Sequence, residues 1–110
     1  MRLGITRRAL CALATASLLA GASLPAMSQD QQQLYTRSLA ATCANCHGTD
    51  GKAVSGSAVV PLVGLSKDYI ATQMKAFKSG TRPATVMHQL SKGYSDTQIE
   101  QIAAYFAAQK

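Results

Sequence analysis

The sequence predicts an all-α domain, and three observations support this prediction. Residues 67–78 and the segment after Ser95 carry apolar side chains at helical spacing and follow residue types that cap helices. The apolar run 59–65 contains Pro61, which argues against a central β-strand. The sequence contains no clear strand pattern, internal repeat or low-complexity tract. Helices with loops between them are therefore expected throughout.

Residues 1–28 have the composition of a secretory signal peptide. Three arginines lie within the first eight residues, residues 10–24 are almost wholly apolar or small, and a small-x-small pattern precedes Gln29. We expect cleavage between Ser28 and Gln29, which makes residues 29–110 the mature domain. The apolar run is shorter than the roughly 20 residues of a membrane span. We therefore expect a soluble periplasmic protein with no stable membrane insertion after cleavage, and an uncleaved anchor is the alternative.

Removal of the leader changes both the charge and the cysteine count. The whole chain has 11 basic and 5 acidic residues and a formal net charge of +6. The leader contains three of the arginines and Cys11, so residues 29–110 have a net charge of +3 and two cysteines, Cys43 and Cys46. No Arg-rich run remains, and no basic stretch is interleaved with aromatic residues. A nucleic-acid partner is not expected.

The first helix of the mature domain is expected over residues 31–43. Asp30 can cap it, and Gln33 three positions later completes a pattern like a capping box. Residues 51–61 are rich in Gly and Ser without a sustained period, which predicts a loop.

The second half of the chain predicts further helices. Ser66 can cap residues 67–78, and residues 86–90 form an apolar cluster that suggests a short helical turn. Ser95 with Gln98 predicts a capping box at the start of the last helix.

The segment Cys43-Ala44-Asn45-Cys46-His47 carries the chemistry. Two cysteines three apart with a histidine directly after the second form a c-type haem attachment pattern. Each thiol adds across one haem vinyl group, and the adjacent histidine supplies a ring nitrogen to the iron. On a helix, the three side chains fall on one face.

Three other interpretations of this segment fit the sequence less well. A zinc site needs about four N or S ligands, but the only other histidine is His88. A thioredoxin-type dithiol sits in a βαβ context, which the flanking sequence does not offer. A structural disulfide would leave His47 unexplained. The sequence therefore favours haem. A covalently tied macrocycle would also supply core to an alanine-rich chain of about 80 residues.

The second axial ligand decides what such a haem can do. The candidates are Met74, Met87 and His88. Met74 lies on the apolar stripe of its helix, where a methionine is usually core. Met87 follows a proline-containing connector that gives the chain slack to reach across the haem, so it is favoured. A solvent-facing position is expected for His88.

The proximal histidine needs an acceptor for its other ring nitrogen. The carbonyl of Pro61 is a candidate for this support of His47, and the alternative is that Pro61 is only a turn residue. Met/His ligation raises the reduction potential. It also leaves no open position at the iron, which predicts an electron carrier with no catalysis by this chain alone.

The chain resembles the small class I c-type cytochromes from about residue 37 to residue 108. The resemblance rests on Cys43-Ala44-Asn45-Cys46-His47-Gly48, Pro61-Leu62-Val63-Gly64, the Met87 segment and Ala104-Tyr105-Phe106. It implies about four helices wrapped around one covalently attached haem c, with Cys43 and Cys46 as thioethers. It also implies His47 and Met87 as axial ligands and a crossing of the first and last helices near Leu39, Ile102 and Tyr105.

A narrower resemblance is to the haem subunit of flavocytochrome c sulfide dehydrogenase. It is carried by residues 39–48, by Arg82-Pro83-Ala84-Thr85-Val86-Met87 and by Lys92-Gly93-Tyr94-Ser95-Asp96. It implies a flavoprotein dehydrogenase subunit as the electron donor and another cytochrome as the acceptor. Some such subunits carry two haem domains, whereas this sequence has a single attachment motif.

Two other functions remain open. A free-standing shuttle to an oxidase or reductase has the same chemistry, and a ring of lysines around the haem edge would favour it. Six cations could form such a ring: Lys52, Lys67, Lys75, Lys78, Arg82 and Lys92. A haem enzyme or gas sensor with an open distal site is the third and least favoured function.

Overall fold

The computed structural model describes residues 24–110. The chain divides into two compact units, Met1–Gln31 and Gln32–Lys110. Of the first unit, residues 24–31 are described, and they are helical. The predicted signal peptide, residues 1–28, lies almost wholly outside the described residues, so its cleavage stays a prediction.

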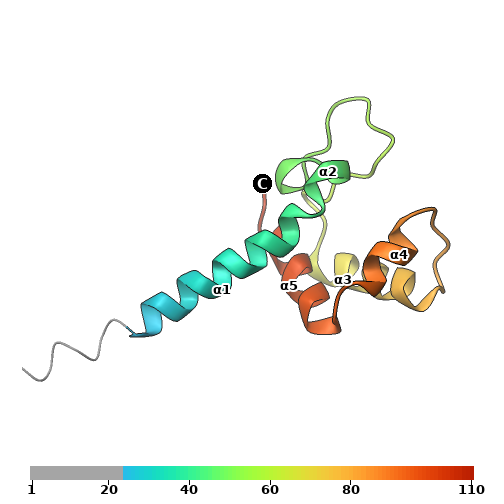
Figure 1. The fold of residues 1–110 in the computed structure, drawn as a ribbon. Helices are drawn as coiled ribbons and strands as arrows, with labels where there is room; N and C mark the ends of the chain where they lie inside the picture. The colour runs from blue at the N-terminus through green and yellow to red at the C-terminus, as the bar shows by residue number, and fades with distance from the viewer. Residues whose placement is uncertain (1–23) are drawn as a thin grey trace, which may run out of the picture. The chain divides into compact units, whose positions relative to one another are not determined.

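Every regular element within residues 24–110 is a helix, which confirms the predicted all-α fold class (Figure 1). None of these helices is both long and apolar enough to cross a membrane. The elements in chain order are α1 (Leu24–Ala41), α2 (Ala44–His47), the 3-10 helix η1 (Thr49–Gly51), α3 (Lys67–Ser79), α4 (Met87–Lys92) and α5 (Asp96–Ala107).

The predicted bounds of the first helix were wrong at both ends. Helix α1 begins at Leu24, so Asp30 lies inside it and does not cap it. Pro25 is tolerated in a first turn, and nothing between it and Asp30 breaks a helix. The helix ends at Ala41, where the Thr42 hydroxyl donates to the Leu39 carbonyl at 2.7 Å. This bond competes with helix continuation and separates α1 from α2.

The predicted caps of α3 and α5 are confirmed. The Ser66 hydroxyl oxygen accepts from the Tyr69 N–H at 3.2 Å. At the start of α5, the Ser95 oxygen accepts from the Gln98 N–H, and the Gln98 side-chain oxygen accepts from the Ser95 N–H, which completes a capping box. Helix α3 ends at Ser79, and Gly80 after it adopts the left-handed conformation. These local signals fix where both core helices begin.

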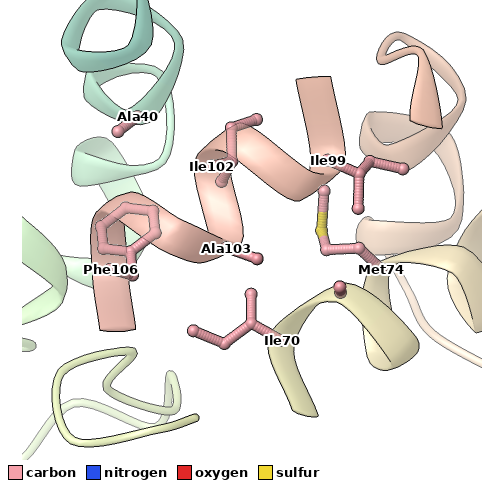
Figure 2. Close-up of a cluster of buried hydrophobic side chains, with 8 residues drawn as sticks. Ala40, Ile70, Met74, Ile99, Ile102, Ala103 and Phe106 are labelled. Carbon is pink, nitrogen blue, oxygen red and sulfur yellow. The ribbon is translucent and has the colours of Figure 1, made fainter. Parts of the chain in front are cut away.

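The core lies where α3 and α5 pack together, with the end of α1 beside α5 (Figure 2). It consists of Ala40, Ile70, Ala71, Met74, Ile99, Ile102, Ala103 and Phe106. Leu39 and Tyr105 are partly buried and pack against this cluster, as the implied helix crossing requires. A further bond joins α1 to α5, because the Gln98 amide donates to the Tyr35 hydroxyl at 2.7 Å. Helix α3 also packs against α4.

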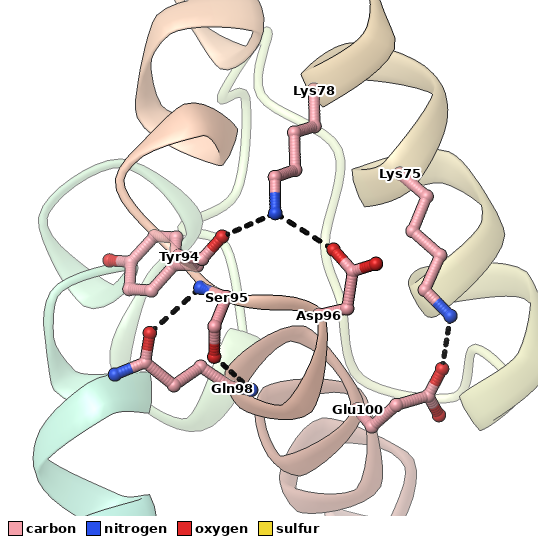
Figure 3. A network of polar contacts seen from close by, with 7 residues as sticks. All are labelled: Lys75, Lys78, Tyr94, Ser95, Asp96, Gln98 and Glu100. Atoms are coloured by element: carbon pink, nitrogen blue, oxygen red, sulfur yellow. Dashed lines mark hydrogen bonds and ion pairs between the residues drawn. The ribbon is translucent and has the colours of Figure 1, made fainter.

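Ion pairs join α3 to α5 at the surface (Figure 3). Glu100 accepts from Lys75 at 2.5 Å and lies 3.2 Å from Lys67. The hydrogen bond from Lys75 holds the pKa of Glu100 below its ordinary value, and Glu100 in turn raises the pKa of Lys75. Lys78 contacts Asp96 at 2.7 Å and lowers the pKa of that carboxyl. Basic side chains of α3 are therefore paired with acidic ones of α5.

Candidate functional site

A cavity of about 510 Å³ lies within the second unit. Its walls are mostly apolar and come from residues 42–43 between α1 and α2, from α2, α3, α4 and α5, and from the loops around residues 59–65 and 82–86. Its size falls in the range of roughly 300–1,000 Å³ typical of sites for small molecules and cofactors. Four predicted site residues line it: Cys43, Cys46, His47 and Met87. Residues forty positions apart in the sequence thus face one cavity.

A short helical turn positions the cysteines and the histidine. Cys43 precedes α2, and the His47 N–H donates to the Cys43 carbonyl at 2.9 Å. This geometry puts the three side chains on one face of the turn, as expected. Cys43 and Cys46 form no disulfide with each other, so both sulfurs are available for thioether bonds. Burial raises the pKa of the Cys43 thiol, against a lowering by the Thr42 hydroxyl.

The chain turns sharply after His47 at Gly48, which has a φ of 82°. A Cβ at this position would lie 2.0 Å from the Lys52 carbonyl oxygen. Only glycine fits here, and the turn directs the chain into η1 and the following loop.

The His47 ring is held by a backbone carbonyl. Its Nδ1–H donates to the Val60 carbonyl at 2.7 Å, which leaves Nε2 for a metal. The expected acceptor, the Pro61 carbonyl, is therefore wrong by one residue. The Gly51 carbonyl accepts from the N–H groups of Leu62 and Val63, at 2.9 and 3.2 Å. Because these bonds fix the chain just past Pro61, the peptide group before it faces His47. Pro61 contributes the nitrogen of that group.

The three candidates for the distal ligand lie in different surroundings. Met87, the first residue of α4, is half-buried and lines the cavity. Met74 also lines it, but its sulfur accepts a hydrogen bond from the buried Ser91 hydroxyl at 3.6 Å. His88 is half-buried and is not a lining residue, so the expectation of a solvent-facing side chain was wrong. Among the contacts described for residues 24–110, the Met74 sulfur has a hydroxyl partner and the Met87 sulfur has none. Met87 is therefore the candidate whose sulfur is available in the cavity.

Sequence reasoning missed two polar contacts in the cavity wall. The hydroxyls of Thr42 and Tyr94 lie 2.5 Å apart, although 52 positions separate them. Arg82 lies 4.5 Å above the centre of the Phe77 ring and donates to Gln73. No spacing in the sequence pairs Thr42 with Tyr94, because only the packing of the folded chain brings these distant residues together.

The donor set fits a haem better than a free metal ion. Within residues 24–110, no group of three or more His, Cys, Asp or Glu side chains could hold a metal. The cavity instead offers two thiols, one imidazole and one thioether in an apolar enclosure. Such ligands suit a haem, which brings four nitrogens of its own and needs only axial and covalent partners.

Comparisons with known proteins agree with the site. The family model "Cytochrome c" matches residues 28–110. The chain is 46% identical over 68 residues to the cytochrome subunit of sulfide dehydrogenase from Chlorobaculum tepidum, covering 62% of this chain and 60% of that protein. It is 30% identical over 90 residues to the thiosulfate dehydrogenase electron acceptor of Stutzerimonas stutzeri, covering 78% and 42%.

A third relative matches over nearly its full length. Cytochrome c-554(548) of Halomonas halodenitrificans is 38% identical over 73 residues, which cover 63% of this chain and 86% of that protein. This chain thus spans about half the length of the first two relatives and most of the third. The predicted resemblance is confirmed: the chain belongs to the cytochrome c family of electron-transfer proteins, which carry covalently attached haem c.

Proposed function

We propose that this protein is a periplasmic one-electron carrier whose haem is anchored by Cys43 and Cys46 and ligated by His47 and Met87. The observation that carries the proposal is the convergence of these four side chains on one apolar cavity. The bound haem would supply an iron that cycles between the ferric and ferrous states. The protein would supply the ligands and exclude water.

The two ligands have different tasks. The Val60 carbonyl orients His47 through its Nδ1–H and raises the basicity of the ring. Met87 offers a soft, weakly basic sulfur that favours ferrous iron and raises the reduction potential. If His47 and Met87 both held the iron, no position would remain for oxygen or peroxide, which would argue against a haem enzyme or gas sensor.

The ligand assignment is tested by Met87→Ala in the haem-loaded protein. We expect loss of the iron–thioether absorption band of the ferric protein and a lower reduction potential, because a weaker ligand or water would replace the sulfur. Met74→Leu is the matched control: this methionine lines the same cavity, and leucine conserves its volume. An unchanged spectrum in Met87→Ala would show that Met87 is not the ligand.

For the electron donor we propose a sulfide-oxidising flavoprotein that binds this chain as a subunit. The similarity to the cytochrome subunit of sulfide dehydrogenase supports this partner. The surface charge supports it as well. Lys67, Lys75 and Lys78 are paired with acidic residues of α5. A lysine paired with a carboxylate attracts an approaching acidic partner less strongly. Three of the six cations in the predicted ring are paired in this way.

A free-standing carrier is the second candidate, with an oxidase, a reductase or another cytochrome as its partner. The match to 86% of the length of cytochrome c-554(548) favours it. In this case no fixed partner subunit exists, and brief electrostatic encounters replace a stable complex.

Purification from the native periplasm separates the two candidates. The tagged protein is recovered at low salt and then washed at high salt, which screens exposed charges but not apolar contacts. A flavin-containing partner that survives the wash supports the subunit proposal, whereas recovery of the cytochrome alone at low salt supports the free carrier. The intact mass of the same sample tests cleavage, because a mature chain should begin at Gln29.

A further inference from the structure

The turn that follows the haem attachment motif, η1, contacts residues of α5. Asp50, inside η1, has a φ of 54°, a left-handed conformation that a non-glycine residue adopts only at a cost. Its carboxylate accepts a hydrogen bond from the Tyr105 hydroxyl at 2.5 Å. The two residues lie 55 positions apart. This contact belongs to neither the ligand set nor the apolar core.

The next residue extends the contact to the loop that carries Val60. Gly51 is buried, and its carbonyl accepts from the Leu62 and Val63 N–H groups. A Cβ on Gly51 would lie 2.8 Å from the Leu62 Cβ and 2.9 Å from the Phe106 ring. Phe106 follows Tyr105 in α5, so neighbouring residues of one helix hold Asp50 and Gly51 in place.

A continuous path therefore leads from α5 to the proximal histidine. It runs from Tyr105 to Asp50, through Gly51 to Leu62, and along the backbone to the Val60 carbonyl that accepts from His47. We propose that Tyr105 is a positioning residue, which holds this carbonyl on His47 through Asp50 and so sets the reduction potential. The inference rests on the proposed role of His47 as an iron ligand.

The direction of the effect follows from the hydrogen bond. A well-aligned acceptor on Nδ1–H makes the imidazole a stronger donor, which favours ferric iron. Loosening the Val60 carbonyl would weaken this donation and raise the potential. The Asp50 carboxylate raises the pKa of Tyr105, so the hydroxyl stays protonated and can donate over the neutral range.

A double-mutant cycle on the haem-loaded protein tests this path. Tyr105→Phe removes only the hydroxyl and keeps the ring, which packs edge-on against Phe106. We expect a roughly threefold shift of the redox equilibrium towards ferrous iron, the size of a modest hydrogen-bond effect. At 59 mV per tenfold for one electron, this is a rise of about 28 mV. Exchange of the His47 Nδ1 proton with solvent, measured by NMR, should also accelerate severalfold.

Asp50→Gly supplies the second variant, because glycine keeps the left-handed turn but lacks the acceptor. In this background, Tyr105→Phe should change neither the potential nor the proton exchange. The charge lost with Asp50 is common to both sides of the cycle and cancels. An equal shift in both backgrounds, or no shift in either, would overturn the proposal.

Tyr35→Phe is the matched control, because it also deletes a tyrosine hydroxyl bonded across to another element, in this case from α1 to α5 and not to η1. It should leave the potential and the proton exchange unchanged, and a shift equal to that of Tyr105→Phe would assign the effect to general loosening. The ligand assignment is judged separately, from the wild-type spectrum and its change in Met87→Ala. A failure of either idea can therefore be told from a failure of the other.

Discussion

The two sides of the cavity are built differently. On the His47 side, hydrogen bonds join α2, η1 and the loop at residues 60–63 to one another. On the Met87 side, α4 has six residues, and Val86 at its start makes no side-chain cap. Val86 is 55% exposed and Leu90 49% exposed, although both line the cavity. Both sides present apolar surface that a cofactor would cover, since Val60 on the histidine side is 61% exposed. They differ because backbone hydrogen bonds tie the loop of the histidine side to η1.

The largest expected effect comes from the core beneath the His47 side. Phe106 is 1% exposed, so Phe106→Ala should lower the free energy of unfolding by about 3–5 kcal/mol. Val54→Ala is the control and should cost about 1 kcal/mol or less, because that residue is 75% exposed and does not line the cavity. Denaturant unfolding of the haem-loaded protein, followed by circular dichroism, measures both losses. Equal losses would mean that Phe106 is no better packed than an exposed loop side chain.

Gly51→Ala tests the tight approach of the loop to α5. The new Cβ meets Leu62 and Phe106 below 3.0 Å, and φ is 76°. A left-handed non-glycine residue costs about 1–2 kcal/mol, and overpacking adds about 1–3 kcal/mol, so a loss of about 2–5 kcal/mol is expected.

Gly64→Ala is the control for this loss, because its φ is 82° but nothing lies within 4 Å of the added Cβ. It should show only the backbone part in the same unfolding assay. A cost as large as that of Gly51→Ala would place the whole effect in the backbone.

The smallest expected effect is at the surface between α3 and α5. Glu100→Gln removes the partner of Lys67 and Lys75, so the unfolding midpoint at pH 7 should fall slightly. Because the folded state lowers the pKa of Glu100, its stabilisation is present above the ordinary value of 4.5 and is lost as the pH falls below it. Wild type and variant should therefore converge in acid.

The same pair has an alkaline limit. Glu100 raises the pKa of Lys75, so the stabilisation by this lysine persists up to its ordinary value and is lost as the pH rises through the raised one. High salt at pH 7 should also remove the difference between wild type and Glu100→Gln. A difference that persisted in acid and in salt would indicate a packing role for this side chain.

Local signals predicted most of the fold. Ser66 and Ser95 cap the predicted helices because a hydroxyl three residues before a free N–H needs nothing from the rest of the chain. The attachment motif likewise predicted one helical face from spacing alone. The predicted start of α1 was wrong. Asp30 matches the pattern of a capping residue, but the helix has already begun at Leu24 and no residue between them breaks it.

The contacts that orient the site could not be predicted in this way. The acceptor for His47 is Val60 and not Pro61, a difference of one peptide group that depends on the bonds to Gly51. The bond from Tyr105 to Asp50 joins distant segments, and only their packing brings them together. Sequence spacing identifies which residues can do the chemistry, and tertiary hydrogen bonds decide how they are held.

Tyr94 is fastened at both ends: its carbonyl accepts from Lys78 at 2.8 Å, and its hydroxyl contacts Thr42 at 2.5 Å. Through its backbone and its side chain, Tyr94 thus links α3 to Thr42, just past the end of α1, along the wall of the cavity. Such hydrogen bonds should limit how far the wall moves when the haem iron gains or loses an electron. The energy needed to rearrange the protein during electron transfer should then be small, whether the iron is being reduced or oxidised.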